Sequence, residues 1–294
     1  MYEKIEHCPS CNSQDFKNHI ICDDYSVSKE SFAIMKCTNC DFLVTSPRPD
    51  KEFIGTYYQS EDYISHTNQA NSLINWVYKI ARSYTLRNKF KLINRLATKK
   101  SILDYGCGTG HLLNYFQNKK SWETIGVEPD EMARTIAISD HDLNVVDSLQ
   151  DLPEKKFGVI TLWHVLEHVH DLNETIQALR SHLSNQGKLI IAVPNPESLD
   201  QKIYKQHWAA YDVPRHLYHF TQSTIEDLMK YNKFVLEETR PMKLDAYYVS
   251  MLSEKHKFGK TNYLKSIING CKSNTWARKN KNNYSSLIYI FKKA

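Results

Sequence analysis

Residues 101–110, SILDYGCGTG, decide how this chain can fold. A short apolar strand ends at Asp104, and three glycines then occupy alternate positions: Gly106, Gly108 and Gly110. Glycine has no Cβ atom, so the backbone can turn sharply and a ligand can lie against its bare amide groups. A helical pattern follows at once, with apolar residues on one face: Leu112, Leu113 and Phe116. The stretch predicts a strand, a ligand-binding turn and a helix.

Two later apolar segments also end in carboxylates. Residues 124–128 (TIGVE) end at Glu128, and an acidic residue about 20 positions after such glycines can accept both ribose hydroxyls of a nucleoside. Asp130 opens the next helix, where a carboxylate favours the helix N-terminus. Residues 144–146 are expected to form a third strand, and Asp147 at its end could take an adenine amino group.

The pattern from Asp104 to Gly110 is D-x-G-x-G-x-G, which differs from the G-x-G-x-x-G dinucleotide fingerprint. It resembles motif I of class I S-adenosylmethionine (SAM) methyltransferases. The resemblance implies an α/β fold with a Rossmann-like seven-stranded methyltransferase sheet and helices on both faces. It also implies that the last strand (285–291) inserts antiparallel beside the sixth (234–239).

The same resemblance implies how the cofactor is held. Asp104 and the three glycines would surround the methionine part of SAM, Glu128 would hold the ribose and Asp147 the adenine. His164, which follows the fourth strand (158–162), is also assigned to the cofactor side.

Four cysteines form two C-x-x-C pairs: Cys8, Cys11, Cys37 and Cys40. Each pair places two thiolates on one tight turn, and two such turns complete a tetrahedral S4 site. Four protein ligands leave no open coordination position, so we expect a structural zinc. Residues 32–35 and 42–44 are expected to pair as strands of this ribbon.

The expected domains are a zinc ribbon (1–48), a helical linker or lid (49–98) and a class I SAM methyltransferase domain (99–294). Aromatic and apolar residues in the middle segment either pack inside the protein or form a lid over the cofactor: Tyr57, Tyr58, Tyr63, Leu73, Ile74, Trp76, Val77, Ile80 and Tyr84. Helical spacing alone does not separate these two interpretations.

The fourth strand runs into Trp163-His164-Val165-Leu166-Glu167-His168. Ligands of open parallel sheets bind beyond the carboxyl ends of the strands, so this segment is expected to face the same crevice as the glycines. The favoured interpretation is that His168 packs near the strand end. The alternative is a divalent metal, because the region is similar to the E-x-x-E-H segment of ubiquinone-pathway O-methyltransferases. His164 replaces the first glutamate of that pattern, which weakens the match for a cation that prefers oxygen ligands.

Residues 208–220, WAAYDVPRHLYHF, form a second cluster of polar side chains after the fifth strand. Arg215 can clamp a carboxylate or phosphate, and His216 can take a proton near neutral pH. The P-R-H-L run resembles a signature of zinc-ribbon methyltransferases from cell-surface polysaccharide and secondary-metabolite gene sets. We expect His216 to be the general base, His168 the second candidate, and Arg215 the residue that orients an anionic acceptor.

Composition and charge are those of an ordinary soluble protein, with 294 residues, 41% hydrophobic, 24% charged and a net charge of +5. From Pro241 to the end, eleven Lys and Arg face two Asp and Glu. The basic residues of such a segment either form an ordinary solvated surface or bind nucleic acid, phosphorylated substrates or anionic lipid. No apolar run approaches the roughly 18 residues of a membrane span, and the N-terminus lacks a secretory pattern. A cytoplasmic location is expected.

These features predict a SAM-dependent methyltransferase that acts on a small molecule, by O-methylation of a sugar, phenol or lipid-linked hydroxyl. A sugar C-methyltransferase is the nearest alternative. A second alternative is an rRNA or tRNA methyltransferase whose zinc ribbon binds RNA. Against it, the ribbon is not basic and the sequence lacks the N/D-P-P-Y/F motif of base-amino methyltransferases. The third alternative is a non-catalytic subunit that keeps the methyltransferase fold. The sequence sets no oligomeric state.

Overall fold

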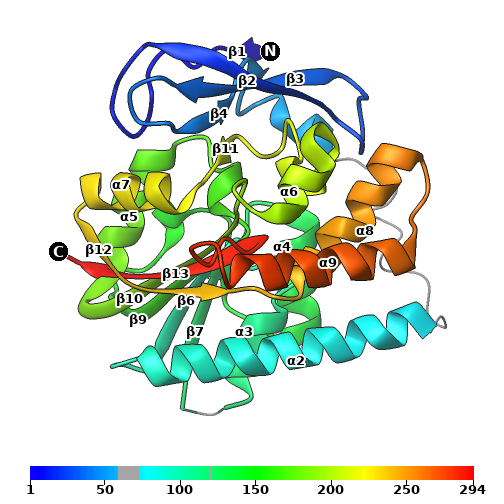
Figure 1. Cartoon of the computed structure of the whole chain (residues 1–294). Helices are drawn as coiled ribbons and strands as arrows, with labels where there is room; N and C mark the ends of the chain where they lie inside the picture. The colour runs from blue at the N-terminus through cyan, green and yellow to red at the C-terminus, as the bar shows by residue number, and fades with distance from the viewer. Residues whose placement is uncertain (59–72, 120) are drawn as a thin grey trace. The chain divides into compact units, whose positions relative to one another are not determined.

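Figure 1 shows the computed structural model, which describes residues 1–58, 73–119 and 121–294, without the side chains of 73–81. The chain divides into two compact units: residues 1–60, 166–173 and 192–289 form the first, and residues 61–165, 174–191 and 290–294 the second. The domain boundaries expected at residues 48 and 98 stay a prediction. Among the described helices, none has the length and apolar character that crossing a bilayer requires.

A seven-stranded sheet with the order β12-β13-β10-β9-β6-β7-β8 carries the glycine loop. Strand β6 pairs in parallel with both β7 and β9, and β7 pairs in parallel with β8. The strand that ends the chain lies next to the sixth strand, as predicted. The predicted Rossmann-like fold class is confirmed, with strands β6 (Ser101–Tyr105), β7 (Glu123–Val127), β8 (Val145–Val146), β9 (Phe157–Trp163), β10 (Leu183–Pro194), β12 (Phe234–Pro241) and β13 (Ser286–Lys293).

The central strands are apolar and buried along nearly their whole length, which is the pattern of a parallel sheet covered on both faces. Helix α2 (Leu73–Leu96) precedes β6 in the chain, and α3 (His111–Gln117), α4 (Glu131–His141) and α5 (Leu172–His182) follow β6, β7 and β9. Asp130 caps α4 as predicted, because its side chain accepts a hydrogen bond from the Ala133 amide at 2.7 Å.

Two elements differ from the sequence prediction. Helix α5 ends at His182 and β10 begins at Leu183, whereas the prediction placed a helix end at 185–187 and the strand from 188. The predicted helical region 245–268 is two helices, α8 (Asp245–Phe258) and α9 (Tyr263–Ala277). Gly259 separates them because it adopts φ 72 and caps α8, its N–H donating to the Lys255 carbonyl at 2.8 Å.

The cysteine pairs flank a second sheet with the order β11-β4-β3-β2. The predicted pairing of the segments near 32–35 and 42–44 is confirmed as antiparallel β3 (Ser31–Cys37) and β4 (Leu43–Thr45). Two members were not predicted, namely β2 (Phe16–Asp23) and β11 (Tyr218–His219), of which β11 comes from the Pro-Arg-His-Leu segment. A small pair, β1 (Tyr2–Glu3) with β5 (Arg48–Pro49), lies outside this sheet.

The remaining helices are short: α6 (Leu199–Tyr204), α7 (Gln222–Tyr231) and the 3₁₀ turns η1 (Ile54–Tyr58), η2 (Leu149–Asp151), η3 (Leu166–His168), η4 (Lys205–His207) and η5 (Ala209–Tyr211). The lid interpretation stays a prediction. Tyr57 is buried in η1 and Tyr84 is exposed on α2. Tyr63 and the side chains of Leu73, Ile74, Trp76, Val77 and Ile80 lie outside the described residues.

Candidate active site

The three glycines of the loop after β6 all adopt left-handed backbone angles, with φ 72 at Gly106, 54 at Gly108 and 78 at Gly110. A Cβ at Gly106 would lie 2.5 Å from Val165, and one at Gly110 would overlap the Leu143 side chain. At Gly108 an added Cβ would meet nothing within 4 Å. Two glycines therefore allow close packing, and the middle one leaves bare backbone open to a ligand.

Glu128 follows β7 and is tied to that open glycine. Its Oε2 accepts a hydrogen bond from the Gly108 amide at 2.7 Å, and its Oε1 accepts one from the Asp130 amide at 3.0 Å. Burial raises the pKa of the Glu128 carboxyl, against the effect of these two N–H donors. The carboxylate and the glycine backbone thus form one cradle, and the role of Glu128 toward the ribose of SAM stays a prediction.

Asp104, at the end of β6, is 3% exposed and accepts a hydrogen bond from the Thr161 hydroxyl at 2.5 Å. Burial raises the pKa of its carboxyl to about 7, although the charge of Lys89 acts in the opposite direction. The Lys89 ammonium also lies 3.9 Å from the centroid of the Trp163 ring. Sequence reasoning missed Lys89, because α2 carries no motif that would assign it to the site.

The two other residues assigned to the cofactor also follow strands of the sheet. Asp147 is exposed directly after β8. His164 is half-buried directly after β9 and adopts φ 58. Their positions at strand ends are those that the sequence predicted, and their roles toward the cofactor stay predictions.

The four cysteines converge as a metal site requires. Their sulfur atoms all lie within 4.8 Å of one another, with Cys8 and Cys40 at 3.5 Å and Cys11 and Cys37 at 3.6 Å. A tetrahedral zinc with Zn–S bonds of about 2.3 Å sets its sulfurs about 3.8 Å apart. The side chains therefore fit a closed S4 zinc site.

Each C-x-x-C pair is followed by a residue in the left-handed region, Asn12 (φ 63) and Asp41 (φ 63). The Asn12 amide donates to the Cys8 carbonyl at 2.8 Å, and the Asp41 amide donates to the Cys37 carbonyl at 3.1 Å. Asn and Asp tolerate this conformation better than most residues. The repeated C-x-x-C-Asn/Asp pattern is thus a further sequence signal for two matching turns.

We expect the purified protein to contain about one zinc per chain, because the four thiolates complete one coordination shell. Plasma mass spectrometry of the native protein measures this, with Cys37→Ser as the variant that should lose the metal. A folded protein without any metal would contradict the assignment.

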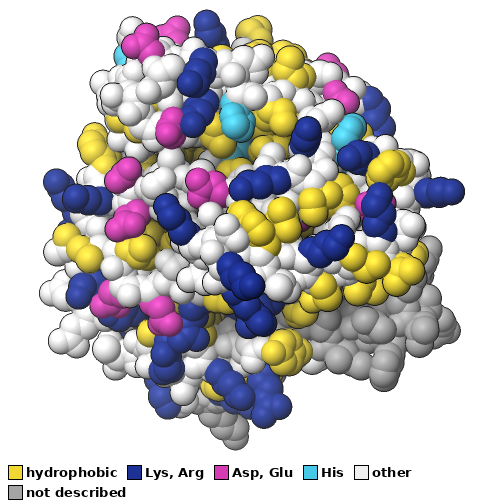
Figure 2. Space-filling view, in the orientation of Figure 1, with side chains coloured by type: hydrophobic (Ala, Val, Ile, Leu, Met, Phe, Trp, Pro, Cys, Tyr) yellow, Lys and Arg dark blue, Asp and Glu magenta, His cyan; other side chains and the backbone are white. Residues whose placement is uncertain are grey.

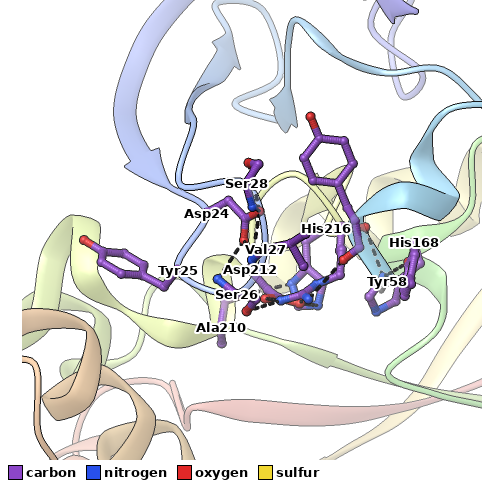
Figure 3. Close-up of polar contacts among 12 residues, drawn as sticks. Asp24, Tyr25, Ser26, Val27, Ser28, Tyr58, His168, Ala210, Asp212 and His216 are labelled. Carbon is purple, nitrogen blue, oxygen red and sulfur yellow. Dashed lines mark hydrogen bonds and ion pairs between the residues drawn. The ribbon is translucent and has the colours of Figure 1, made fainter. Parts of the chain in front are cut away.

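Two histidines form the centre of the second cluster, in the first unit of the chain (Figure 3). The rings of His168 and His216 lie 4.6 Å apart and nearly perpendicular. Nδ1–H of His216 donates to the Ala210 carbonyl, and Nδ1–H of His168 donates to the Arg215 carbonyl, both at 3.0 Å. Since each ring uses Nδ1 as its donor, each neutral ring carries its lone pair on Nε2.

The surroundings of the two rings differ. Burial, followed by the neighbouring His216, lowers the pKa of His168 to about 4. The Tyr58 hydroxyl lies 2.9 Å from His168 Nδ1. His216 Nε2 instead faces a carboxylate, with Asp212 Oδ2 at 3.8 Å. His216 thus faces the Asp212 carboxylate at Nε2, and a Glu167 carboxylate oxygen lies within 4.8 Å of a ring nitrogen of both histidines.

The Arg215 side chain forms hydrogen bonds within its own loop and with the N-terminal ribbon. Its Nε donates to Asp212 Oδ2 at 3.0 Å, and a second nitrogen pairs with Asp212 Oδ1. It also donates to the Ser26 hydroxyl at 2.7 Å and to the Tyr57 carbonyl at 3.3 Å. Burial would raise the pKa of Asp212, but Arg215 holds it below its ordinary value. These contacts make Arg215 a support for Asp212, and its role toward an anionic acceptor stays a prediction.

The backbone of this loop is held by the zinc-ribbon sheet. The Thr45 hydroxyl donates to the His216 carbonyl at 2.7 Å, and the Thr45 amide donates to the Leu217 carbonyl at 3.0 Å. Leu217 in turn donates its N–H to the Glu167 carbonyl at 2.7 Å. His216 and Leu217, directly before β11, are thus hydrogen-bonded to both Thr45 and η3.

The cluster also contains a donor set for a divalent metal. One ligand atom each of Glu167, His168 and His216 lies within 4.8 Å of the others. His164, which the sequence grouped with Glu167 and His168, is not part of this set. Two imidazoles and one carboxylate suit zinc, iron or manganese.

Comparison with known proteins identifies the protein family to which the sheet and its glycine loop belong. A family model described as "Methyltransferase domain" matches residues 78–239, which is more than half of the chain. The chain belongs to this family. Its glycine loop and strand order are those of a class I SAM-dependent methyltransferase domain.

A solved structure shares the fold of this methyltransferase domain. Magnesium protoporphyrin IX methyltransferase (ChlM) from Synechocystis PCC 6803, solved with bound SAH, matches with a TM-score of 0.53 and 14% identity. The match covers 83% of this chain and 100% of that one.

Curated relatives match over a shorter stretch. The ubiquinone biosynthesis O-methyltransferase of Histophilus somni is 33% identical over 111 residues, which are 33% of this chain and 46% of that protein. An uncharacterized protein of Haemophilus influenzae is 25% identical over 111 residues, 33% of this chain and 43% of that protein. The methyltransferase chain thus spans less than half the length of these relatives.

Proposed function

We propose that this protein transfers a methyl group from SAM to an oxygen of a small-molecule acceptor. The observation that carries the proposal is the cradle formed by Glu128 and the open backbone of Gly108, joined by a 2.7 Å hydrogen bond. A carboxylate beside glycine backbone that no side chain covers suits a nucleoside and the polar groups next to it.

Within this proposal, SAM supplies a methyl group on a positively charged sulfur that is already a good leaving group. The Glu128 carboxylate accepts hydrogen bonds from the ribose hydroxyls, and Asp147 accepts one from the adenine amino group. Asp104, at the other side of the glycine loop, places negative charge near the cationic methionine part. The protein's main task is then to hold the reacting atoms in line.

His216 is our proposed general base. Its Nε2 lone pair takes the proton of the acceptor hydroxyl while the acceptor oxygen bonds to the methyl carbon and the carbon–sulfur bond breaks. Asp212, held by Arg215, stabilises the resulting imidazolium. The cluster follows β9 closely in sequence, since only residues 164–167 separate the end of β9 from His168. His168 is the second candidate.

Alternatively, the same side chains could bind a metal ion. Glu167, His168 and His216 could hold a divalent cation that lowers the pKa of the acceptor hydroxyl directly. Metal content separates the two roles. A second metal equivalent that survives Cys37→Ser and is lost in His216→Ala favours the metal, and its absence favours the base.

Calorimetric titration of SAM and S-adenosylhomocysteine into the zinc-loaded protein tests the cofactor assignment. We expect micromolar binding of both, since both share the nucleoside that the cradle would hold. If neither binds, the non-catalytic subunit becomes the better interpretation.

The affinity for SAM should also depend on pH. The Asp104 carboxyl has a pKa of about 7, and a cationic ligand beside it favours the deprotonated form. Below pH 7, binding must release a proton, so the Kd should rise by up to about tenfold per pH unit as the pH falls. Above pH 7 the Kd should level off. Calorimetry in buffers of different ionisation enthalpy measures the proton released, and a Kd that stays flat below pH 7 would place Asp104 away from the bound cation.

A further inference from the structure

Helix α9 buries its polar face and exposes its apolar one. The buried side carries Ser266, Asn269, Gly270, Ser273, Asn274 and Ala277. The other side carries large apolar side chains that are 43–71% exposed: Tyr263, Leu264, Ile267 and Ile268. A surface helix of a globular protein ordinarily has the reverse arrangement.

Hydrogen bonds to buried partners fix this orientation. The Ser273 hydroxyl donates to Asp200 Oδ1 at 2.6 Å, and the Asn269 amide donates to the Tyr204 hydroxyl at 2.8 Å. Asp200 is fully buried. Rotating α9 to bury its leucine and isoleucines would break these bonds and leave a buried carboxylate with fewer donors. The outward apolar face is therefore built into the fold of this unit.

Lysines are frequent in the segment that carries this apolar face, and one of them, Lys265, also pairs with the buried Glu254 at 3.3 Å. Residues 255–272 contain five lysines, all exposed, and no Asp or Glu: Lys255, Lys257, Lys260, Lys265 and Lys272. The Lys265 ammonium lies 4.3 Å from the ring centroid of Phe258, a side chain that is 51% exposed at the end of α8. Figure 2 shows hydrophobic and basic side chains side by side over α8 and α9. We call Phe258, Tyr263, Leu264, Ile267, Ile268 and these five lysines the docking face.

We propose that the docking face binds the surface of an anionic lipid bilayer. Aliphatic side chains can enter the boundary between headgroups and acyl chains, while lysines extend to the lipid phosphates. No described helix can cross the bilayer, so the attachment is peripheral. This attachment is independent of the methyl-transfer chemistry.

The charge pattern argues against two other occupants. A twofold interface between copies would bring the same patch against itself and set the five lysines of one copy near those of the other. A nucleic acid would neutralise the lysines, but it offers no partner for Leu264, Ile267 and Ile268. An anionic bilayer offers phosphates to the lysines and an apolar interior to the aliphatic side chains.

Co-sedimentation of the full-length, zinc-loaded protein with vesicles tests the proposal. One set of vesicles is phosphatidylcholine alone, and the other contains added phosphatidylglycerol. We expect binding to the anionic vesicles only, weakened by salt. Lys257→Gln with Lys260→Gln should reduce the partition coefficient by about fivefold per lysine. Leu264→Ser with Ile267→Ser should reduce it by about tenfold per residue.

The matched control is Tyr231→Ser on α7, which removes a side chain that is 64% exposed outside the docking face and should leave vesicle binding unchanged. Unchanged melting temperature and SAM affinity show that each variant is folded. Equal binding to neutral vesicles, or no binding to either kind, overturns the proposal. So does a dimer in sedimentation velocity that Leu264→Ser with Ile267→Ser converts to monomer, which would assign the face to a second copy.

Discussion

His216→Ala should lower kcat by about 10²- to 10⁴-fold, the range expected when a general base is removed, while the Kd for SAM stays unchanged. Two observations support this result. Nδ1–H donates to the Ala210 carbonyl, so the lone pair lies on Nε2, and Nε2 faces the Asp212 carboxylate. Steady-state turnover with a methyl acceptor, together with calorimetric SAM binding, separates the loss of chemistry from the loss of cofactor.

His182→Ala serves as the control for this result. His182→Ala removes an imidazole whose only described hydrogen bond goes to the Lys155 carbonyl, and we expect kcat within about twofold of the native value. Asp212→Asn should lower kcat less than His216→Ala, because it removes the partner of the imidazolium and not the base. If turnover survives in His216→Ala, the base lies elsewhere, and His168→Ala is the next variant to measure.

The cofactor side of the fold could be predicted because its signals are local. The glycines after β6, the carboxylate after β7 and the cap at Asp130 each depend on a few consecutive residues, and short-range sterics and hydrogen bonding set their conformation. The two C-x-x-C pairs are also local, and a tetrahedral metal brings them together. These features could be assigned without knowing what lies next to them in space.

The rest of the site depends on contacts between distant segments. Thr45 and His216 are brought together by the pairing of β4 with β11, a strand too short to give a periodic pattern. Lys89 acts on Asp104 from a helix that carries no motif. Helix α9 reverses the usual polarity because its Ser and Asn side chains find buried partners, so its periodicity alone would place the wrong face inside.

Glu128→Ala should weaken SAM binding by about 100-fold or more. A carboxylate that accepts hydrogen bonds from two ribose hydroxyls contributes about 1.5–3 kcal/mol for each bond. In the structure the same carboxylate also accepts the Gly108 amide, so the variant loses part of the support of the glycine loop. Calorimetric titration measures the affinity. Glu128→Gln keeps the size of the side chain but not its charge, so its SAM affinity should lie between that of Glu128→Ala and that of the native protein.

The matched control for Glu128→Ala is Asp130→Ala, two residues along the same turn. Asp130 accepts the Ala133 amide as the cap of α4, so its loss should cost about 1 kcal/mol of folding free energy and leave SAM affinity nearly unchanged. Thermal melts monitored by circular dichroism should therefore show the larger shift in Asp130→Ala, whereas calorimetry should show the larger loss in Glu128→Ala. Unchanged SAM affinity in a folded Glu128→Ala protein would remove Glu128 from the ribose site. The glycine loop would then have to bind the cofactor through its backbone amides and Asp104 alone.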